Sequence, residues 1–593
     1  MQISTASLIE SASVPEAFFG TASHNASRPA QWYRKDGNYL PVTYRQLELR
    51  VRHVAAGLLK AAIKPGDRVA ILMENRPEWA VADFAILSIG AVTVPLYCSY
   101  RPQDMRYVLE DCDAKCVITS GGALLRHLLE AAAECPDVRA IYALDPKGDS
   151  KLMHSFAELE ETPEANEELD SRVQALTRDS LATLIYTSGT TGNPKGVMLS
   201  HGNILSAIAA VTPIIDFHAD DKMLSFLPLA HVLERLAGHF AVYLLGFSVA
   251  FAERPDTVAK NLPEAQPTIL ISVPRLYEVM RNRILGQVAN ASKLRQTLFH
   301  SYFNISRKLR TQAAGPVSRM IFPILDKLVG EKIRTRFGGK LRIMFSGGAP
   351  LSLEVGDFLD GLRLPIIEGY GMTESTALIA LTPPGRRKPG TVGLPPEGID
   401  IRISDDGEIQ VHALNITKGY WNLPKATKEA LVDGWLHTGD IGEFDEDGYL
   451  RITGRKKEII VTSGGENIAP QRVEGLLITD ALIEQAAVFG DRRPYLVAAI
   501  VPSPEACLAW ANAEGLPETD WEKLAASKVL RKALQSRINE ILNPLNPFEQ
   551  VRRILVLEQP FSVENEMLTP TLKVRRNKVL EIYGEAVEDL YST

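Results

Sequence analysis

The sequence predicts an α/β protein in two parts. A large N-terminal domain of stacked α/β subdomains, ending in a small β-barrel-like region, is expected over residues 1–454, and a smaller α+β domain over residues 455–593. The chain of 593 residues is too long for a single hydrophobic core. Short apolar runs alternate with helix-length segments from Asp67 onward, and hairpin signals replace this pattern after about residue 390.

The apolar runs of the first part predict buried, largely parallel strands. They cover residues 68–73, 91–96, 116–119, 184–186, 268–272 and 341–345. Segments of helical length separate them, such as residues 77–89 and 201–211. Strands that are apolar throughout and alternate with helices are typical of a parallel sheet covered by helices. The run 240–252 is too short to cross a bilayer, so we interpret it as a buried helix followed by a strand.

Two tight turns predict an antiparallel region at the end of the large domain. Asp405-Asp406-Gly407 lies between two alternating runs, and Asp447-Gly448 precedes another. The short charged segment 454–457, which begins with a glycine, indicates a joint between the domains. A final helix is expected from about residue 574 to residue 591.

Composition and charge exclude several classes of function. Hydrophobic residues make up 45% and charged residues 23%, as in globular proteins, and the net charge of −7 disfavours a nucleic-acid partner. The five cysteines show no zinc-ligand spacing, which predicts reduced thiols. The N-terminus has no basic stretch followed by an apolar one. A cytoplasmic location is therefore expected.

One segment departs from the average charge. Residues 293–340 contain eleven Lys or Arg residues and two acidic residues, with aromatic and aliphatic side chains between them. Such a stretch can rest on an anionic membrane surface, which would place the protein at the inner face of a membrane. The alternative is a solvated helix pair whose apolar side covers the core.

A loop rich in glycine and hydroxyl groups follows the run 184–186. Residues 187–196 read Thr-Ser-Gly-Thr-Thr-Gly-Asn-Pro-Lys-Gly, and residues 201–211 are expected to form the next helix. Glycine backbone, hydroxyl groups and Lys195 could together bind phosphate. The spacing excludes a P-loop, because Pro194 follows Asn193 where a glycine is required, and Gly196 follows Lys195. Composition alone leaves a phosphate loop and a flexible turn equally open.

The run Tyr186–Gly196 closely resembles the signature loop of the adenylate-forming acyl-CoA synthetases. Six further runs resemble the family's other motifs and occur in the family's order. They are residues 227–231 (Leu-Pro-Leu-Ala-His), 346–350 (Ser-Gly-Gly-Ala-Pro), 368–374 (Glu-Gly-Tyr-Gly-Met-Thr-Glu), 434–440 (Gly-Trp-Leu-His-Thr-Gly-Asp), 454–458 (Gly-Arg-Lys-Lys-Glu) and, near the end, 569–573 (Thr-Pro-Thr-Leu-Lys). The resemblance extends over residues 30–580. It implies that a carboxylate attacks ATP to give an acyl-adenylate, which a thiol then attacks.

The resemblance implies ATP, Mg²⁺ and coenzyme A as cofactors or co-substrates, and it assigns roles to individual residues. Those assigned to catalysis are Lys573, Lys195, Thr373, Glu374 and His231. Those assigned to the bound nucleotide or to coenzyme A are Thr187, Ser188, Gly189, Thr190, Thr191, Gly192, Gly347, Gly348, Ala349, Glu368, Gly369, Tyr370, Gly371, Asp440, Arg455, Lys457, Gly464 and Gly465. Glu374 would hold Mg²⁺ together with Thr187, since this hard cation prefers oxygen ligands.

The chemistry of the side chains agrees with these roles. Lys195 and the loop hydroxyl groups suit phosphates, Tyr370 can stack on adenine, and Asp440 and Arg455 suit the hydroxyl groups of a ribose. Lys573 would stabilise charge on the α-phosphate during the first half-reaction. Because it belongs to the second domain, that domain is expected to move, and the resemblance places the hinge at Lys457.

Three stretches, residues 225–235, 254–277 and 568–576, resemble the long-chain fatty acid branch. A long-chain fatty acid and coenzyme A are therefore the expected substrates. The alternatives are an acyl-AMP ligase that loads a carrier protein, a ligase for medium-chain or aryl acids, and a catalytically silent lipid-binding relative. The intact set of charged residues disfavours the silent relative. The sequence leaves the chain length of the acid and the oligomeric state open.

Overall fold

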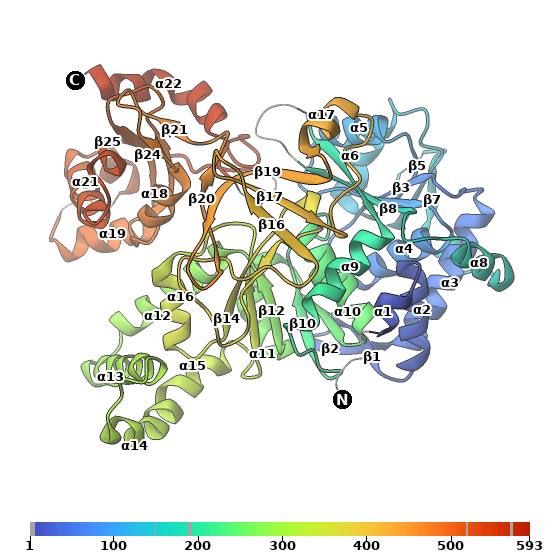
Figure 1. The fold of residues 1–593 in the computed structure, drawn as a ribbon, viewed down its shortest axis with the longest axis horizontal. Helices are drawn as coiled ribbons and strands as arrows, with labels where there is room; N and C mark the ends of the chain where they lie inside the picture. The colour runs from blue at the N-terminus through green and yellow to red at the C-terminus, as the bar shows by residue number, and fades with distance from the viewer. Residues whose placement is uncertain (1–5, 149, 188–192, 517–519, 570–572, 593) are drawn as a thin grey trace.

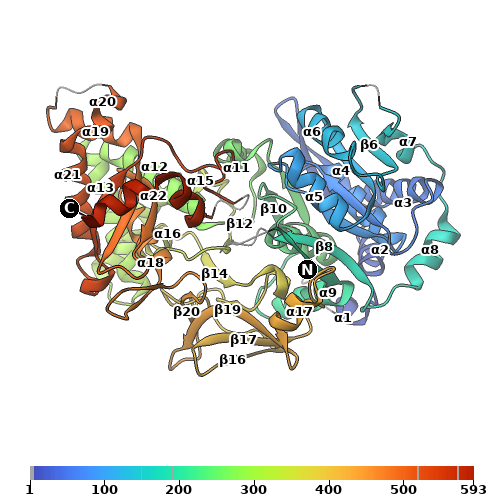
Figure 2. The ribbon, with the colours of Figure 1, turned by 90° about the horizontal axis from the view of Figure 1, so that it is seen from above.

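The structure, a computed structural model, describes residues 6–148, 150–187, 193–516, 520–569 and 573–592. Two large sheets with their helices form the N-terminal part, a five-stranded sheet lies beside them, and a smaller lobe carries the C-terminus (Figure 1). Viewed from above, the first sheet and the C-terminal lobe lie at opposite ends of the molecule (Figure 2). This arrangement confirms the predicted fold class.

The first sheet has seven strands in the order β7-β6-β5-β3-β4-β8-β9. Their bounds are Arg68–Leu72 (β3), Val92–Pro95 (β4), Ala114–Gly121 (β5), Ala140–Asp145 (β6), Met153–Ser155 (β7), Leu181–Thr187 (β8) and Lys195–Ser200 (β9). All neighbours are parallel except β8 and β9. The expectation of a single loop between Tyr186 and His201 was therefore wrong, because β9 returns antiparallel to β8 and pairs Lys195 with Thr187. The six residues Lys195–Ser200 do not alternate between buried and exposed positions, so the strand left no periodic signal in the sequence.

The second sheet has eight strands in the order β15-β14-β13-β12-β10-β11-β1-β2. Their bounds are Pro29–Lys35 (β1), Asn38–Thr43 (β2), Lys222–Ser225 (β10), Ser248–Phe251 (β11), Ile269–Ser272 (β12), Ile343–Ser346 (β13), Ile366–Tyr370 (β14) and Ala380–Leu381 (β15). The six inner strands are parallel, and only the two edge strands run antiparallel to their neighbours. The predicted parallel strands are confirmed in both sheets.

A buried helical layer joins the two sheets. Helix α4 (Pro77–Ser88) is buried from Trp79 to Ser88, as expected of a helix that is packed on every side. One hydrophobic core contains α4 together with Ile71 of the first sheet and Ile269 of the second. The run 240–252 contributes α10 (Ala241–Leu245) and β11 to this region, which confirms the prediction of a buried helix and strand.

Further helices cover the outer faces and edges of the N-terminal part. They are α1 (Ala6–Glu10), α2 (Val14–His24), α3 (Tyr44–Lys60), α5 (Pro102–Asp111), α6 (Gly122–Ala132), α7 (Phe156–Glu160), α8 (Asn166–Gln174), α9 (His201–Val211), α11 (Val258–Ala265), α16 (Leu353–Gly361) and α17 (Pro424–Ala430). Residues Glu234–Phe240 form a short π-helix before α10. Helix α9 has the bounds that the sequence predicted.

The basic segment forms a helical arm at the lower left of Figure 1. The helices of the arm are α12 (Pro274–Ala289), α13 (Lys293–Arg310), α14 (Pro316–Leu325) and α15 (Glu331–Thr335). Phe299, Tyr302 and Phe322 anchor the arm in a core that also contains α16. Among the described residues, no helix of the arm or elsewhere is long and apolar enough to span a bilayer.

The five-stranded sheet is the half-barrel that the two tight turns predicted. Its strands are β16 (Ile399–Ile403), β17 (Glu408–Ala413), β18 (Leu431–Val432), β19 (Trp435–Phe444) and β20 (Leu450–Arg455). Neighbouring strands run antiparallel, and the turns at residues 404–407 and 445–449 join β16 to β17 and β19 to β20. This sheet leads the chain into the C-terminal lobe.

The C-terminal lobe is a small α+β unit with cores of its own. Its strands are β21 (Ile460–Val461), β22 (Asn467–Ile468), β23 (Ile483–Phe489), β24 (Leu496–Pro502) and β25 (Val551–Val556). Its helices are α18 (Pro470–Leu477), α19 (Pro504–Ala513), α20 (Trp521–Ala525), α21 (Lys528–Leu542) and α22 (Arg576–Ser592). The helix predicted from about residue 574 is α22.

The burial of His201 makes stability depend on pH. The imidazole lies at the start of α9, and its Nδ1 accepts the Val14 N–H over 3.3 Å. Burial lowers the pKa of His201 to about 3, so below about pH 6 the unfolded chain binds a proton that the folded chain excludes. As the pH falls from the pKa of histidine in the unfolded chain toward its pKa in the folded chain, His201 should therefore lower the free energy of unfolding by about 1.4 kcal/mol per pH unit.

Urea unfolding of the wild type and of His201→Asn between pH 7 and pH 4 tests this expectation. Asparagine keeps an acceptor near Val14 but does not titrate. The unfolding free energy of the variant should therefore fall less steeply than that of the wild type as the pH is lowered. Equal slopes in the two proteins would show that His201 does not contribute.

Candidate active site

Several predicted site residues lie where strands of the two large sheets end. Thr187 ends β8 and Lys195 begins β9, while Gly347 and Gly348 directly follow β13. Glu368, Gly369 and Tyr370 end β14, and Thr373 and Glu374 lie in the short 3₁₀ helix that follows. The carboxyl ends of parallel strands are the usual place for ligands in such sheets. Ser188, Gly189, Thr190, Thr191 and Gly192 lie outside the described residues.

Glycines let the two nucleotide motifs of the second sheet approach closely. A Cβ atom on Gly347 would lie 3.7 Å from the Gly369 carbonyl oxygen, so the ends of β13 and β14 are neighbours. A Cβ atom on Gly371 would lie 2.2 Å from the carbonyl carbon of Ala377, which no side chain could tolerate. Gly348 has φ of +80°, a conformation that favours glycine, and Ala349 continues this segment. The motif glycines therefore set the backbone path at this edge.

Three predicted nucleotide contacts form one cluster, in which Tyr370 and Asp440 are buried and Arg455 is partly exposed. Asp440 of β19 and Arg455 of β20 are opposite each other in the register, and Arg455 Nε lies 3.1 Å from Asp440 Oδ1. The Tyr370 hydroxyl donates to Asp440 Oδ2 over 2.7 Å. Burial raises the pKa of Asp440, although Arg455 acts in the opposite direction. This cluster joins the half-barrel to the second sheet.

A residue that the sequence reasoning missed connects Glu374 to Lys195. The Tyr420 hydroxyl donates to Glu374 Oε1 over 2.7 Å, and Lys195 Nζ lies 5.0 Å from the centre of the Tyr420 ring. The backbone of Glu374 is held as well, because its carbonyl accepts the Thr417 N–H over 2.7 Å. Tyr420 lies in a Gly-Tyr-Trp run that has no chemical signature of its own, so only the fold could identify it.

Lys573 reaches this region from the C-terminal lobe. Part of its side chain is open to solvent, yet its ammonium group is sufficiently enclosed that burial is the largest influence on its pKa, which it lowers. Arg455 lowers the pKa further, whereas the carboxylates of Asp440 and Glu374 raise it. The Lys573 ammonium group is thus close enough to these residues of the N-terminal part for their charges to act on its pKa.

His231, on the N-terminal side, is within electrostatic reach of Lys573. Burial lowers the pKa of His231 to about 4, and the charge of Lys573 adds to this effect. His231 Nδ1 accepts the Leu233 N–H over 3.3 Å, which fixes the orientation of the ring. The imidazole is therefore neutral near pH 7.

The Glu368 carboxylate pairs with residues outside the Tyr370 cluster. It lies 3.5 Å from Arg387 Nε, and Arg387 in turn lies 3.5 Å from Asp360. Burial raises the pKa of Glu368 to about 7 despite Arg387. A contact between Glu368 and nucleotide stays a prediction.

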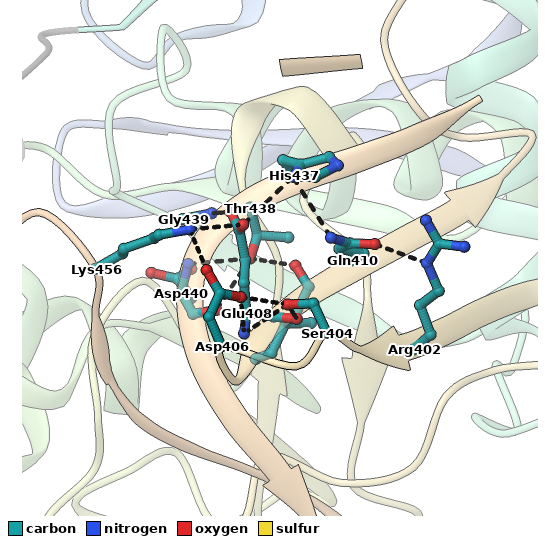
Figure 3. Close-up of polar contacts among 11 residues, drawn as sticks. Arg402, Ser404, Asp406, Glu408, Gln410, His437, Thr438, Gly439, Asp440 and Lys456 are labelled. Carbon is teal, nitrogen blue, oxygen red and sulfur yellow. Dashed lines mark hydrogen bonds and ion pairs between the residues drawn. The ribbon is translucent and has the colours of Figure 1, made fainter. Parts of the chain in front are cut away.

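The segment that joins the half-barrel to the C-terminal lobe is held by a polar network (Figure 3). Lys456 Nζ lies 2.5 Å from Asp406 Oδ2 and 3.3 Å from Glu408 Oε2. The buried Glu408 also accepts the Gly439 N–H over 2.8 Å. Lys457 is exposed in the turn after β20.

Gly464 and Gly465 lie in the turn between β21 and β22, where Gly465 has φ of +86°. In the described part of the chain, no hydrogen bond or ion pair joins this turn to Asp440 or Lys195. Their role in binding coenzyme A stays a prediction.

The donors present fit Mg²⁺ bound together with substrate phosphates. The described residues contain no cluster of three or more His, Cys, Asp or Glu side chains that could hold a metal alone. Glu374 offers a buried carboxylate, and Thr187 a hydroxyl, on the same side as Lys195. Mg²⁺ commonly takes one or two protein oxygens and completes its shell with phosphates and water.

Family comparison agrees with this two-part site. Residues 18–421 match the model of the AMP-binding enzyme family, and residues 457–593 match that of the AMP-binding enzyme C-terminal domain. The chain therefore belongs to the AMP-binding enzyme family.

Among its relatives are curated long-chain-fatty-acid–CoA ligases. The protein named FadD15 from Mycobacterium bovis is 36% identical over 569 residues, which cover 94% of this chain and 93% of FadD15. Long-chain-fatty-acid–CoA ligase 5 from Rattus norvegicus is 32% identical over 95% of this chain and 86% of the ligase.

Solved structures share the fold at lower identity. The adenylation domain of a carboxylate reductase from Mycobacterium chelonae superposes with a TM-score of 0.78 at 22% identity, covering 100% of this chain and 94% of that domain. The anthranilate CoA ligase AuaEII, solved with anthranoyl-AMP, gives a TM-score of 0.72 at 19% identity, covering 97% and 98% of the two chains.

Proposed function

We propose that this protein uses ATP to convert a long-chain fatty acid into acyl-AMP and then into acyl-CoA, with release of pyrophosphate and AMP. The observation that supports this most is the position of Lys573. The charge of this lysine, which comes from the C-terminal lobe, acts on the pKa of His231 in the N-terminal part, and the carboxylates of Asp440 and Glu374 act on its own pKa. Relatives that cover almost the whole chain are named as long-chain-fatty-acid–CoA ligases.

In the first half-reaction, a carboxylate oxygen of the fatty acid attacks the α-phosphorus of ATP, and the bond to pyrophosphate breaks. Lys573 and Thr373 stabilise the charge on the α-phosphate, and Lys195 holds the outgoing phosphates. Tyr370 and Gly347–Ala349 hold the adenine, while Asp440 and Arg455 hold the ribose. Neutral His231 lies beside the carboxylate without adding charge. Mg²⁺, held by Glu374 and Thr187, neutralises phosphate charge when bound.

In the second half-reaction, the thiolate of coenzyme A attacks the acyl carbonyl, and AMP leaves with the electron pair of the broken C–O bond. The proposed units are an N-terminal domain of residues 1–454 and a mobile C-terminal domain of residues 455–593. Rotation at Lys457 withdraws Lys573 and brings Gly464 and Gly465 toward the thiol path. These small residues leave room for the thin pantetheine arm.

Product analysis with ATP, palmitate and coenzyme A tests the proposal. We expect palmitoyl-CoA, AMP and pyrophosphate in equal amounts. Stable palmitoyl-AMP without a thioester would instead indicate a ligase that loads a carrier protein. Greater turnover with benzoate or octanoate than with palmitate would contradict the long-chain assignment.

We also propose that the protein is cytoplasmic and that its helical arm rests on the inner, anionic face of a membrane. Val317, Met320, Ile321, Ile324 and Leu328 recur at helical spacing along α14 and the short π-helix that follows it (Asp326–Gly330), and all are exposed. Met320 is 73% exposed and Ile324 62%. Arg319 and Lys327 lie on the same segment and have no ion pair within the described residues. An exposed apolar stripe beside unpaired cations suits a lipid surface.

The double substitution Met320→Glu and Ile324→Glu should weaken binding to vesicles of equal parts phosphatidylcholine and phosphatidylglycerol by about tenfold or more. The charges oppose both insertion and attraction to anionic lipid. Co-sedimentation measures this binding, and added salt should weaken it in the wild type. The control, Leu414→Glu with Val529→Glu, changes apolar residues that are exposed elsewhere.

Equal binding by the stripe variant and the wild type would contradict the membrane proposal. If the stripe variant instead changed the oligomeric state seen by light scattering, and the wild type did not bind vesicles, the stripe would be an interface between copies of the chain.

A further inference from the structure

The joint between the two proposed domains is bounded on both sides by polar contacts. On the N-terminal side, the Lys456 ammonium pairs with Asp406 at 2.5 Å and with Glu408 at 3.3 Å (Figure 3). The Lys456 backbone N–H also donates to the Gly439 carbonyl over 2.7 Å. Residue 456 is thus fixed to the half-barrel by its side chain and its main chain.

Glu408 connects this contact to the nucleotide site. Its Oε1 accepts the Gly439 N–H, while its Oε2 faces Lys456 and also lies 3.3 Å from His437 Nδ1. Gly439 immediately precedes Asp440, and Asp440 pairs across the strands with Arg455. Lys456 is therefore held by the same strand that carries the predicted ribose contact.

On the C-terminal side, Glu458 is fixed to the C-terminal lobe. Its Oε2 accepts Gln471 Nε2 over 2.6 Å and lies 3.3 Å from Arg576 Nη1. Arg576 also pairs with Glu474, so Glu458 is attached to both α18 and α22. Arg576 lies three residues after Lys573, so this contact links the joint to the proposed adenylation lysine.

Lys457 lies between these two attached residues, and its own side chain is not attached to either lobe by a described residue. It is exposed, and it makes no hydrogen bond or ion pair with any residue that the structure describes. The side chains of the residues before and after it are tied to different lobes, although the Glu458 N–H also donates to the Arg455 carbonyl over 2.9 Å. A change in the backbone angles of Lys457 would thus rotate the lobes without breaking either side-chain attachment, at the cost of this main-chain hydrogen bond.

We propose that Lys456 and Glu458 are positioning residues that confine the rotation between half-reactions to Lys457. This inference rests on the proposed two-step function. Loss of either attachment spreads the rotation over several residues, so the lobes adopt more arrangements. The fraction of molecules with Lys573 correctly placed then falls, and the observed rate falls with it.

Two measurements on Lys456→Gln test the proposal. The kcat of acyl-CoA formation should fall by about tenfold while the KM for ATP changes by less than about twofold, because Lys456 is not assigned to the nucleotide. Cleavage by trypsin after Lys457 should become several-fold faster, because a segment that opens more often is cut more often. Glu458→Gln should behave in the same way.

Matched variants separate this role from general stability. Lys388→Gln removes a similar surface pair, with Asp445 at 2.7 Å, from the half-barrel, and it should change neither measurement. Lys456→Arg keeps the cation and should restore both. The thermal unfolding midpoint should be close to that of the wild type in all four variants.

Unchanged kcat and unchanged cleavage in both Lys456→Gln and Glu458→Gln would overturn the proposal. Equal changes in Lys388→Gln would overturn it as well. A wild type that forms neither acyl-AMP nor acyl-CoA would refute the proposed function instead, and the cleavage rates would still decide whether the two attachments restrain the joint.

Discussion

Replacing Lys573 with alanine should lower the rate of acyl-AMP formation by about 100-fold to 1000-fold. The charge of this ammonium group acts on the pKa of His231, and Asp440, Arg455 and Glu374 act on its own pKa, so it is close to the residues that we propose bind the nucleotide. A cation that meets charge as it develops contributes more than one that only binds the ground state. Pyrophosphate release in the absence of coenzyme A measures this half-reaction.

The second half-reaction distinguishes this role from damage to the fold. Lys573→Ala should still convert added palmitoyl-AMP and coenzyme A into palmitoyl-CoA at nearly the wild-type rate, since the proposed rotation withdraws Lys573 in that step. Lys578→Ala is the matched control. Lys578 pairs with Glu566 and Glu581 on the surface, and its loss should change either rate by less than about twofold. Undiminished pyrophosphate release in Lys573→Ala would refute the assigned role.

Replacing Glu374 with glutamine should lower acyl-AMP formation by about 100-fold. The carboxylate is buried, and its Oε1 accepts a hydrogen bond from the Tyr420 hydroxyl, which leaves Oε2 for a cation. Glutamine keeps the size and one oxygen but removes the charge that attracts Mg²⁺. Initial rates across a Mg²⁺ series should show that the variant needs more Mg²⁺ for half-maximal activity.

Tyr420→Phe separates the charge of Glu374 from its orientation. It removes only the hydroxyl that donates to Glu374 Oε1, so the expected loss is about fivefold, as for one hydrogen bond. If Glu374→Gln and Tyr420→Phe lost activity equally, with no change in Mg²⁺ dependence, Glu374 would not be a metal ligand.

The strands of the large sheets could be predicted because their sequences are apolar throughout. Residues 68–73 and 268–272 are almost entirely apolar, and both form central parallel strands. The hairpins were predictable for another reason, since Asp405-Asp406-Gly407 and Asp447-Gly448 satisfy the backbone needs of tight turns. Gly407 and Gly448 indeed have positive φ values of 81° and 80°.

Contacts between residues far apart in the chain could not be predicted in this way. Tyr420 forms a hydrogen bond with Glu374, which lies 46 positions earlier in the chain. A tyrosine in such a sequence is as typical of core packing as of an active site. The pairing of Glu368 with Arg387 also depends on the fold, because a carboxylate in a nucleotide motif gives no sign of the direction in which it points. The influence of the Lys573 charge on the pKa of His231 depends on the fold as well, because the two residues belong to different lobes.

The central claim is that the fatty acid attacks the α-phosphorus of ATP. The most direct test uses palmitate labelled with oxygen-18 in its carboxylate, together with ATP and coenzyme A, and mass analysis of the products. We predict that AMP gains one labelled oxygen, because the attacking carboxylate oxygen stays on the α-phosphate when the thioester forms. Label in inorganic phosphate, together with ADP, would show attack on the γ-phosphorus and contradict this account.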